Sequence, residues 1–248
     1  MELISVIMPY YKKKDFFLES IQSVLSQTYQ NFEIIIIYDD PNIIDLKFIL
    51  EIKKLDKRIK VIKNNKNLGV GISRNIGISY SDGFYLAFLD CDDIWYKDKL
   101  EVQINFMKNN KISFSYTSYD VINSKNIIIN KKEVAEKITF NDLLRNCDIG
   151  LSTVIMNKNL ISDSCKFPKL KTKEDFVLWL TLAKKMDLHG INLSLSQWRK
   201  LNNSLSSYKF QKIKDGFNVY KKYMKFSYLK SCLYLIILSI KFLKKNLY

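Results

Sequence analysis

Short apolar runs alternate with segments of helical period along the first hundred residues of the chain. The runs predict four strands, Leu3–Met8, Phe32–Ile37, Ile59–Ile62 and Phe84–Leu89. The segments between them predict three helices, one capped by Asp15, one from Ile43 to Lys54 and one from Ile72 to Ser79. Strands this apolar are buried on both faces, and their alternation with helices specifies parallel strands joined by right-handed crossovers. We therefore expect a three-layer α/β/α sandwich with a mostly parallel central sheet.

The pattern changes beyond residue 110. The elements expected there are an antiparallel pair Ile112–Tyr119 and Val121–Asn130, a short helix Phe140–Asn146, a strand Ser152–Met156 and a helix that opens at Lys173. We expect one domain over residues 1–206, with an α/β half over 1–100 and an α+β half over 101–206. A helical tail over residues 207–248 follows this domain.

Composition narrows the class of protein. The chain has 248 residues of which 47% are hydrophobic, so it can bury a full core. The four cysteines form no CxxC pair and no ligand-like spacing with His189, which indicates neither a zinc site nor a disulfide framework and fits a reducing cytosol. The net charge of +15 raises nucleic acid as a partner. We expect none, because the aromatic residues lie mostly within apolar strands and are not interleaved with basic ones.

Basic residues gather at the carboxyl end of the chain. Residues 209–248 hold ten lysines and one acid, Asp215, beside the largely apolar run Cys232–Ile240. A transmembrane helix is not expected, because a span needs about 20 apolar residues. On a helical wheel one side of this helix is basic and the other is apolar, which predicts a basic amphipathic helix on an anionic membrane surface. The basic side holds Lys230, Lys241, Lys244 and Lys245, and the apolar side holds Leu229, Cys232, Leu235, Ile236, Phe242 and Leu243. The alternatives are packing on the protein's own core or on a second subunit in a homodimer.

Three carboxylates, Asp90, Asp92 and Asp93, follow the strand Phe84–Leu89 within four positions. In an open parallel sheet, ligands bind beyond the carboxyl ends of the strands. Crowded carboxylates repel one another unless a cation lies among them, and an all-oxygen site suits Mg²⁺ or Mn²⁺. The other interpretation is that Asp92 or Asp93 caps the helix that follows.

Further polar residues are expected at the same edge of the sheet. Strand one ends in Pro9-Tyr10-Tyr11, strand two ends in Asp39-Asp40, and Arg74 lies in the segment after strand three. An aromatic ring, a carboxylate, an arginine and a metal cluster are what a nucleotide diphosphate requires for its base and its phosphates.

These segments in this order resemble the family 2 glycosyltransferases, inverting enzymes of the GT-A fold that use nucleotide sugars. The resemblance runs from Leu3 to about Ser206. It rests on Ser5-Val6-Ile7-Met8-Pro9-x-Tyr11, Ser23-Val24-Leu25-Ser26-Gln27-Thr28-Tyr29, Arg74-Asn75-x-Gly77, Phe88-Leu89-Asp90-Cys91-Asp92-Asp93-Ile94-Trp95, and Glu174-Asp175 with Trp179. In a protein of this kind, residues 1–100 would be the nucleotide-binding half and 101–206 the acceptor half.

The resemblance implies a donor site at the strand ends. Asp40, together with Asp39, would accept a hydrogen bond from a uracil-type base, and Tyr11 beside Pro9 would stack on that base. An ordinary turn is the alternative for the two acids. The chain also departs from the family here, because Pro41-Asn42 stands where a Gly-Ser type pair is common.

The same comparison places the diphosphate and its metal ion. Asp92 would bind Mn²⁺ or Mg²⁺, and Asp90 would contact the ribose or a metal-bound water. Arg74 would lie on the donor side, and Arg199 would approach the diphosphate. The alternatives are a solvated helix arginine for Arg74 and a surface arginine for Arg199. The histidine that commonly follows in the family is replaced by Leu201 or Asn202.

Asp175 corresponds to the catalytic base of the family. A sugar hydroxyl is a poor nucleophile until its proton is removed, and inversion requires that base opposite the leaving group. A helix N-cap is the alternative reading of Asp175, and the two roles are compatible.

The resemblance implies an inverting, metal-dependent transfer of a sugar from a nucleotide-sugar donor, taken as a UDP-sugar, to a hydroxyl of a glycan or lipid-linked glycan acceptor. We expect such an enzyme in the cytoplasm, peripheral at the inner face of the membrane, in the synthesis of a cell-surface polysaccharide or lipooligosaccharide. The competing hypotheses are a nucleotidyltransferase of related fold and a non-catalytic basic module that binds membrane or nucleic acid.

Overall fold

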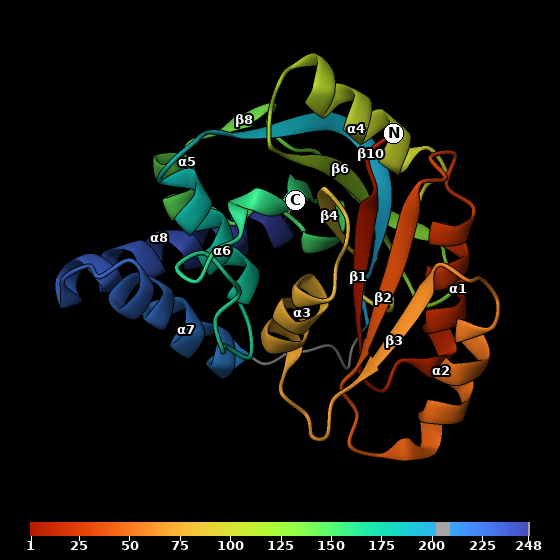
Figure 1. Ribbon diagram of the computed structural model, residues 1–248. Helices are drawn as coiled ribbons and strands as arrows, with labels where there is room; N and C mark the ends of the chain where they lie inside the picture. The colour runs from red at the N-terminus through yellow and green to blue at the C-terminus, as the bar shows by residue number, and fades with distance from the viewer. Residues whose placement is uncertain (202–208, 248) are drawn as a thin grey trace.

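A mixed β-sheet runs through the middle of the molecule in the computed structural model, which describes residues 1–201 and 209–247 (Figure 1). The strand order is β3-β2-β1-β4-β9-β6-β10-β5, with β7 paired to β6 and β8 paired to β10. The strands are β1 Ile4–Tyr10, β2 Phe32–Tyr38, β3 Ile59–Lys63, β4 Tyr85–Phe88, β5 Ile94–Trp95, β6 Phe114–Ile122, β7 Ile128–Lys132, β8 Lys137–Ile138, β9 Ile155–Asn157 and β10 Leu188–Arg199.

The longest strand pairings are parallel. β1 runs parallel to β2 and β4, β2 runs parallel to β3, and the register of β1 with β2 is unbroken from Ile4 opposite Phe32 to Tyr10 opposite Tyr38. In the second half β6 is parallel to β10, while β9 is antiparallel to both β4 and β6. The expected α/β class with a mostly parallel sheet is therefore confirmed.

Helices cover both faces of the sheet, which gives the expected three layers (Figure 1). They are α1 Lys14–Leu25, α2 Leu46–Lys53, α3 Val70–Ser79, α4 Lys99–Asn109, α5 Phe140–Arg145, α6 Glu174–Ala183, α7 Lys209–Asn218 and α8 Tyr228–Leu247. Side chains alternate across β1, so that Val6 and Met8 belong to the core cluster that contains residues of α1, α2 and α4, whereas Ile7 belongs to the cluster that contains residues of α3, α5, α6 and α8. Burial of apolar residues on both faces explains why the strands read as continuous apolar runs.

Several boundaries differ from the sequence prediction. Asp15 does not cap α1, because the N-cap is Lys13 and Asp15 lies in the first turn. The helix expected from Ile43 begins as a 3₁₀ helix, Ile43–Asp45, before α2. The predicted hairpin forms, but Val121 belongs to β6 and not to the second strand. Ser152 lies in a short 3₁₀ helix, Leu151–Thr153, that precedes β9.

The carboxyl-terminal helices pack against the rest of the protein. After α7 the chain forms a π-helix over Val219–Tyr223 and then α8. The ring of Tyr220 stacks on Tyr234 of α8 at 5.5 Å, and its hydroxyl donates to the carbonyl oxygen of Leu144 on α5. Leu238 on α8 is buried in the same core. The tail thus packs against α5 and the core of the protein, as the core-packing alternative describes, while part of α8 stays exposed.

Among the described residues, no helix has both the length and the apolar composition to cross a bilayer.

Candidate active site

The carboxyl ends of β1, β2 and β4 meet at one edge of the sheet. The backbone N–H of Asp39 donates to the carbonyl oxygen of Tyr10 at 2.9 Å, and Leu89 donates to Ile7 at 3.1 Å. Because the strands are parallel, the residues that follow them emerge side by side. The structure therefore brings Tyr11, the pair Asp39-Asp40 and the segment 90–93 to the same edge, as the sequence predicts.

Asp39 and Asp40 are both buried, and both accept hydrogen bonds from the protein. Asp39 accepts from the backbone N–H groups of Leu68 and Gly69 at 2.8 and 2.9 Å, so it holds the loop that leads into α3. Gly69 in this loop has φ 88°, a conformation that favours glycine. Asp40 accepts from the backbone N–H of Asn42 at 3.0 Å in the turn that its sequence context allows. Contact of the two acids with a base stays a prediction.

The two tyrosines at the end of β1 lie in different environments. Tyr10 is buried, stacks on Tyr38 with ring centroids 5.5 Å apart, and donates its hydroxyl to Asp45 at 2.8 Å. Tyr11 is 43% exposed, so its ring is accessible for stacking. Pro9 is buried within β1, opposite Ile37 of β2. Its ring is therefore part of the strand and is not exposed at the edge of the sheet where Tyr11 lies.

Arg74 connects two parts of the edge that lie far apart in the sequence. It is 3% exposed, and its guanidinium donates to Asp90 at 2.7 Å and to Glu174 on α6. Burial lowers the pKa of Arg74, but the charges of Asp90 and Glu174 raise it by more than burial lowers it. The net pKa of Arg74 therefore lies above its ordinary value. The Nε atom of Arg74 is buried and has no hydrogen-bond partner within the part of the chain that the structure describes. Arg74 is therefore not the solvated helix arginine of the alternative reading.

Glu174 and Asp175 begin α6 beside this arginine. Burial raises the pKa of Glu174 to about 7, an effect that the charge of Arg74 opposes and that of Asp175 reinforces. Burial likewise raises the pKa of Asp175, again opposed by the charge of Arg74. Asp175 accepts from the backbone N–H of Phe176 at 2.7 Å. The carboxylate of Asp175 is therefore more basic than that of an ordinary aspartate. It is adjacent in sequence to Glu174, which Arg74 joins to Asp90.

The segment after β4 is held by cations and by backbone donors. Asp92 pairs with Lys13 at 2.9 Å; burial raises the pKa of Asp92 and the contact with Lys13 lowers it, with a net rise. Asp93 is buried and accepts from the hydroxyl of Ser152 at 2.6 Å, while burial and then the charge of Asp92 raise its pKa. Asp93 braces the loop and does not face an opening. Lys13 was not among the predicted residues, although it lies two positions after Tyr11 at a strand end.

Asp90 and Asp92 form a donor set that suits a hard divalent cation. Within residues 1–201 and 209–247, no group of three or more acidic, histidine or cysteine side chains is arranged to hold a metal ion. Mg²⁺ is nevertheless usually bound by one or two carboxylates together with substrate phosphates, not by an all-protein cage. The raised pKa of Asp92 means that burial penalises its charge, and a close cation offsets that penalty. The residues present therefore fit an ion that arrives with a diphosphate.

Arg199 at the end of β10 is fully enclosed. Its backbone N–H donates to Asp93 at 3.0 Å, and its side chain donates to the carbonyl oxygen of Asp92 at 2.8 Å, to Glu19 on α1 at 2.7 Å and to Asn126 in the hairpin turn. Arg199 therefore fixes the loop that carries the carboxylates, and it is no surface arginine. Its predicted approach to a diphosphate stays a prediction. The segment 202–206 of the same motif lies outside the described residues.

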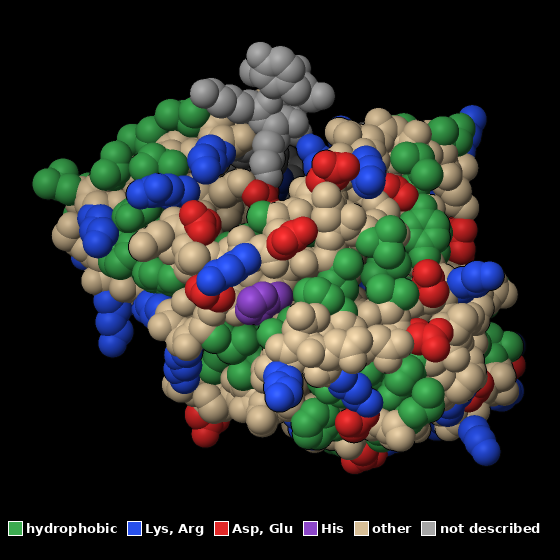
Figure 2. Space-filling view, turned by 90° about the horizontal axis from the view of Figure 1, so that it is seen from above, with side chains coloured by type: hydrophobic (Ala, Val, Ile, Leu, Met, Phe, Trp, Pro, Cys, Tyr) green, Lys and Arg blue, Asp and Glu red, His purple; other side chains and the backbone are tan. Residues whose placement is uncertain are grey.

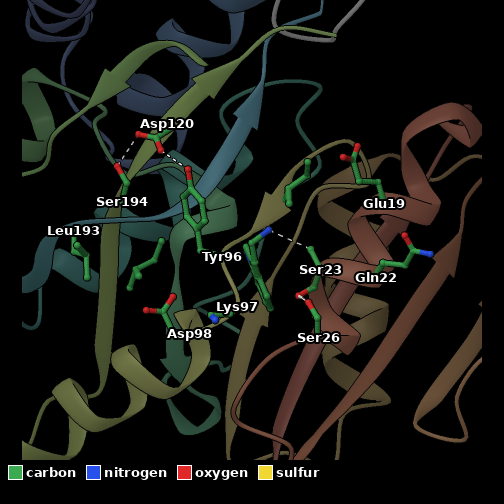
Figure 3. A pocket seen from close by; sticks show the side chains of 13 residues that line it. Glu19, Gln22, Ser23, Ser26, Tyr96, Lys97, Asp98, Asp120, Leu193 and Ser194 are labelled. Atoms are coloured by element: carbon green, nitrogen blue, oxygen red, sulfur yellow. Dashed lines mark hydrogen bonds between the residues drawn. The ribbon is translucent and has the colours of Figure 1, made fainter. Parts of the chain in front are cut away.

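A groove of about 840 Å³ lies on the α1 face of the sheet, between α1, the segment 94–98 and β10 (Figure 3). In it Asp120 accepts from the hydroxyl of Tyr96 at 2.6 Å and from Ser194 at 2.9 Å. None of the predicted donor, metal or base residues lines this groove. We therefore place the candidate site at the strand ends and not in this groove.

Known proteins of similar sequence or fold match most of this chain. The family model described as glycosyl transferase family 2 matches residues 5–161. The chain is 40% identical over 219 residues to the UDP-Glc:alpha-D-GlcNAc-diphosphoundecaprenol beta-1,3-glucosyltransferase WfgD of Escherichia coli, covering 88% of this chain and 85% of the relative. It is 33% identical over 231 residues to the putative teichuronic acid biosynthesis glycosyltransferase TuaG of Bacillus subtilis, covering 92% and 91%.

Among solved structures, residues 1–349 of S. aureus TarS in complex with UDP-GlcNAc superpose with a TM-score of 0.75 and 19% sequence identity, covering 95% of this chain and 70% of that one. This likeness supports the fold. The family match ends at residue 161, before Asp175, so the role of that residue rests on the geometry of α6.

The bonds of Arg199 generate a stability prediction. Arg199→Lys keeps the positive charge but loses the planar group that reaches three elements at once, so a buried charge loses its bonds to the Asp92 carbonyl oxygen, Glu19 and Asn126. We expect the free energy of unfolding to fall by about 2 to 4 kcal/mol, measured by chemical denaturation. Arg145→Lys, at an exposed position on α5, is the matched control and should change it by less than about 0.5 kcal/mol. An equal effect of the two substitutions would contradict the bracing role.

Proposed function

This chain belongs to the family 2 glycosyltransferases, and on that premise we propose that it transfers a sugar, with inversion, from a UDP-sugar to a hydroxyl of an undecaprenyl diphosphate-linked glycan. One observation carries the proposal: Arg74 joins Asp90, at the predicted donor edge, to Glu174, the neighbour of the predicted base Asp175. A donor acid and a base that lie 85 positions apart in the sequence thereby flank one site.

The proposed reaction is a single in-line displacement. Asp175 accepts the proton of the acceptor hydroxyl while the oxygen forms a bond to the anomeric carbon, and the bond from that carbon to the diphosphate oxygen breaks. The electron pair of the broken bond leaves with the UDP. Burial raises the pKa of Asp175, which makes it a stronger base than an ordinary aspartate. Arg74 holds a positive charge between Asp90 and Glu174, which offsets the repulsion between these two carboxylates.

The remaining donor contacts are proposals of the same kind. Tyr11 stacks on the base, and Asp39 and Asp40 at the end of β2 lie beside it. Asp90 and Asp92 would hold Mn²⁺ or Mg²⁺, which supplies positive charge to the leaving diphosphate. Lys13, bonded to Asp92, keeps that carboxylate compensated before the donor arrives.

The acceptor and the place of action follow from the relatives and from α8. WfgD is named for transfer to a GlcNAc-diphosphoundecaprenol, an acceptor whose long apolar chain suits a membrane. A row of side chains on α8 is exposed: Leu229, Leu233, Ile236, Ile240 and Leu243 are 81%, 56%, 55%, 49% and 61% accessible. They recur at helical spacing, so they form one stripe, which we call the α8 stripe. The α8 stripe includes Leu229, Ile236 and Leu243 of the predicted apolar side. Two other residues of that side, Cys232 and Leu235, are only partly exposed, and Leu235 packs against the core.

Charge around the α8 stripe fits an anionic surface. Lys225, Lys230 and Lys241 are exposed, and the single acid of residues 209–248, Asp215, is buried. Figure 2 shows hydrophobic side chains beside Lys or Arg side chains at its left, over the region of α7 and α8. Apolar side chains that enter the acyl boundary beside lysines that meet anionic headgroups are the design of an interfacial helix. We therefore propose that the enzyme works peripherally at the inner face of the cytoplasmic membrane. The side chains of Phe242, Lys244 and Lys245, named with this tail, lie outside the described part.

The base assignment predicts the effect of Asp175→Asn. The amide cannot accept the proton, so turnover with UDP-glucose and GlcNAc-diphosphoundecaprenol should fall by about a hundredfold to ten-thousandfold, while UDP binding measured by calorimetry stays unchanged. In the wild-type enzyme kcat should fall as the pH decreases through the raised pKa of Asp175, because the protonated carboxyl is no base. Asp163→Asn, at an exposed position, is the matched control. Wild-type turnover by Asp175→Asn would remove Asp175 from this role.

The metal assignment predicts that Asp92→Ala loses metal-dependent donor binding. UDP should bind the wild-type protein more tightly with Mn²⁺ or Mg²⁺ than with EDTA, and the variant should show no such difference, because one of two proposed ligands is gone. Asp98→Ala, in the same segment but outside the proposed ligand set, should behave like wild type. Equal metal dependence of UDP binding in both variants would refute the assignment of Asp92.

The α8 stripe predicts binding to anionic vesicles. The wild-type protein should sediment with phosphatidylglycerol–phosphatidylcholine vesicles and not with phosphatidylcholine alone. Replacing Leu233 and Ile236 together by Glu should weaken binding at least about tenfold, because two buried apolar side chains are lost. The matched control replaces Ile128 and Ile129 on β7, which are 54% and 51% exposed. If the protein ignores vesicles and forms a dimer that the Leu233 and Ile236 substitutions dissociate, the stripe is instead a homodimer interface.

A further inference from the structure

The single acid of the lysine-rich end of the chain is used inside the protein. Asp215 on α7 is 3% exposed, although ten lysines share residues 209–248 with it. Its Oδ2 atom accepts two hydrogen bonds from Thr172, one from the backbone N–H and one from the hydroxyl, both at 3.0 Å. Thr172 is itself buried. A buried carboxylate that accepts two bonds from one residue fixes the position of that residue.

Thr172 lies three positions before Asp175, at the turn that starts α6. Lys173 between them has φ 63°, a left-handed conformation that is uncommon for a residue with a side chain. The N-cap of α6 has no side-chain hydrogen bond. The conformation of this turn is therefore not held by a side-chain cap of α6. It is held by the two bonds from Thr172 to Asp215 on α7.

Packing brings α7 against the same turn. A Cβ atom added to Gly216, the neighbour of Asp215, would lie 2.9 Å from the Cδ1 atom of Leu235 on α8 and 3.6 Å from the Cε atom of Lys173. The helix backbone thus approaches both α8 and the turn closely. In addition, Tyr220 of the π-helix contacts Phe176, with ring centroids 6.3 Å apart, one residue after Asp175. The carboxyl-terminal helices therefore touch α6 on both sides of the proposed base.

We propose that Asp215 is a positioning residue for sugar transfer. It fixes the Thr172–Lys173 turn and thereby the direction in which the Asp175 carboxylate meets the acceptor hydroxyl. The inference rests on the proposed role of Asp175, and it gives the carboxyl-terminal helices a function in the site beyond contact with a membrane. The first turn of α6 is then held from two directions, by Arg74 through Glu174 and by Asp215 through Thr172.

Such a residue should affect turnover more than binding. A base displaced by about 1 Å from its productive geometry can cost about a hundredfold in rate. In the proposed site the donor is bound at the ends of β1, β2 and β4. The bonds of Asp215 go to Thr172, which lies before α6 and not on these strands. Loss of Asp215 should therefore lower kcat and leave donor binding intact.

The test compares Asp215→Ala with Asp215→Asn in the full-length protein. The alanine variant should lose about tenfold to a hundredfold in kcat for transfer from UDP-glucose to GlcNAc-diphosphoundecaprenol, with the KM for UDP-glucose within about twofold of wild type. The asparagine variant keeps a carbonyl oxygen for both donors of Thr172, so it should restore most of the turnover. The acid limb of the pH profile should also move in the alanine variant, because the surroundings of Asp175 change.

A second pair guards against a failure of folding. Thr172→Val removes the hydroxyl bond and leaves the backbone bond, whereas Thr172→Ser keeps both. The valine variant should lose about fivefold in kcat and the serine variant should match wild type, with equal melting temperatures by circular dichroism.

The outcomes separate this inference from the proposed function. If Asp175→Asn abolishes transfer but folded Asp215→Ala and Thr172→Val turn over like wild type, Asp215 is not a positioning residue and the base assignment stands. A parallel loss of UDP binding and turnover, or no restoration by asparagine, would also overturn it. If Asp175→Asn keeps its turnover, the proposed function fails first.

Discussion

The pairing of buried Arg74 with two carboxylates is the interaction on which the candidate site depends. A guanidinium that is 3% exposed has lost most of its hydration, and this loss is offset only if anionic partners are held close to it. Asp90 after β4 and Glu174 at the start of α6 are those partners. Because the charge must be satisfied from both sides, the segment after β4 and the start of α6 are joined at the edge where chemistry is proposed. Removal of either acid would leave a buried charge with half its compensation.

Compensation of buried charge recurs along the same edge. Asp92 is matched by Lys13, Asp93 by the hydroxyl of Ser152 and the backbone of Arg199, and Asp39 by backbone N–H groups of the loop before α3. Each acid thus has a partner from another element. These partners offset the repulsion between the carboxylates, so the acids can lie at one edge of the sheet. A site of this kind is organised before a donor enters, which reduces the reorganisation that binding and reaction require.

The sequence predicted the first half of the fold well, because its signals are local. The strand Phe32–Ile37 is so apolar that only a doubly covered strand can accommodate it, and β2 appears there with one more residue. The strand ends could then be placed at one edge by the parallel topology alone. β10 was not predicted, since its side chains alternate irregularly between buried and exposed and its register with β6 shifts twice. The bonds of Arg74 with Glu174 and of Asp215 with Thr172 were also out of reach, because they depend on how elements pack.

Arg199 has a consequence for the order of assembly. Its bond to Glu19 spans 180 positions, and its other partners lie in the hairpin turn and in the segment after β4. Bringing residues so far apart in the sequence together costs conformational entropy, and such contacts form slowly. We therefore expect the Arg199–Glu19 bond to form after the sheet between them. The same side chain connects the end of β10 with α1 and with the loop that carries Asp92 and Asp93. During synthesis on the ribosome, these bonds to the loop therefore form only after the chain has been made as far as residue 199.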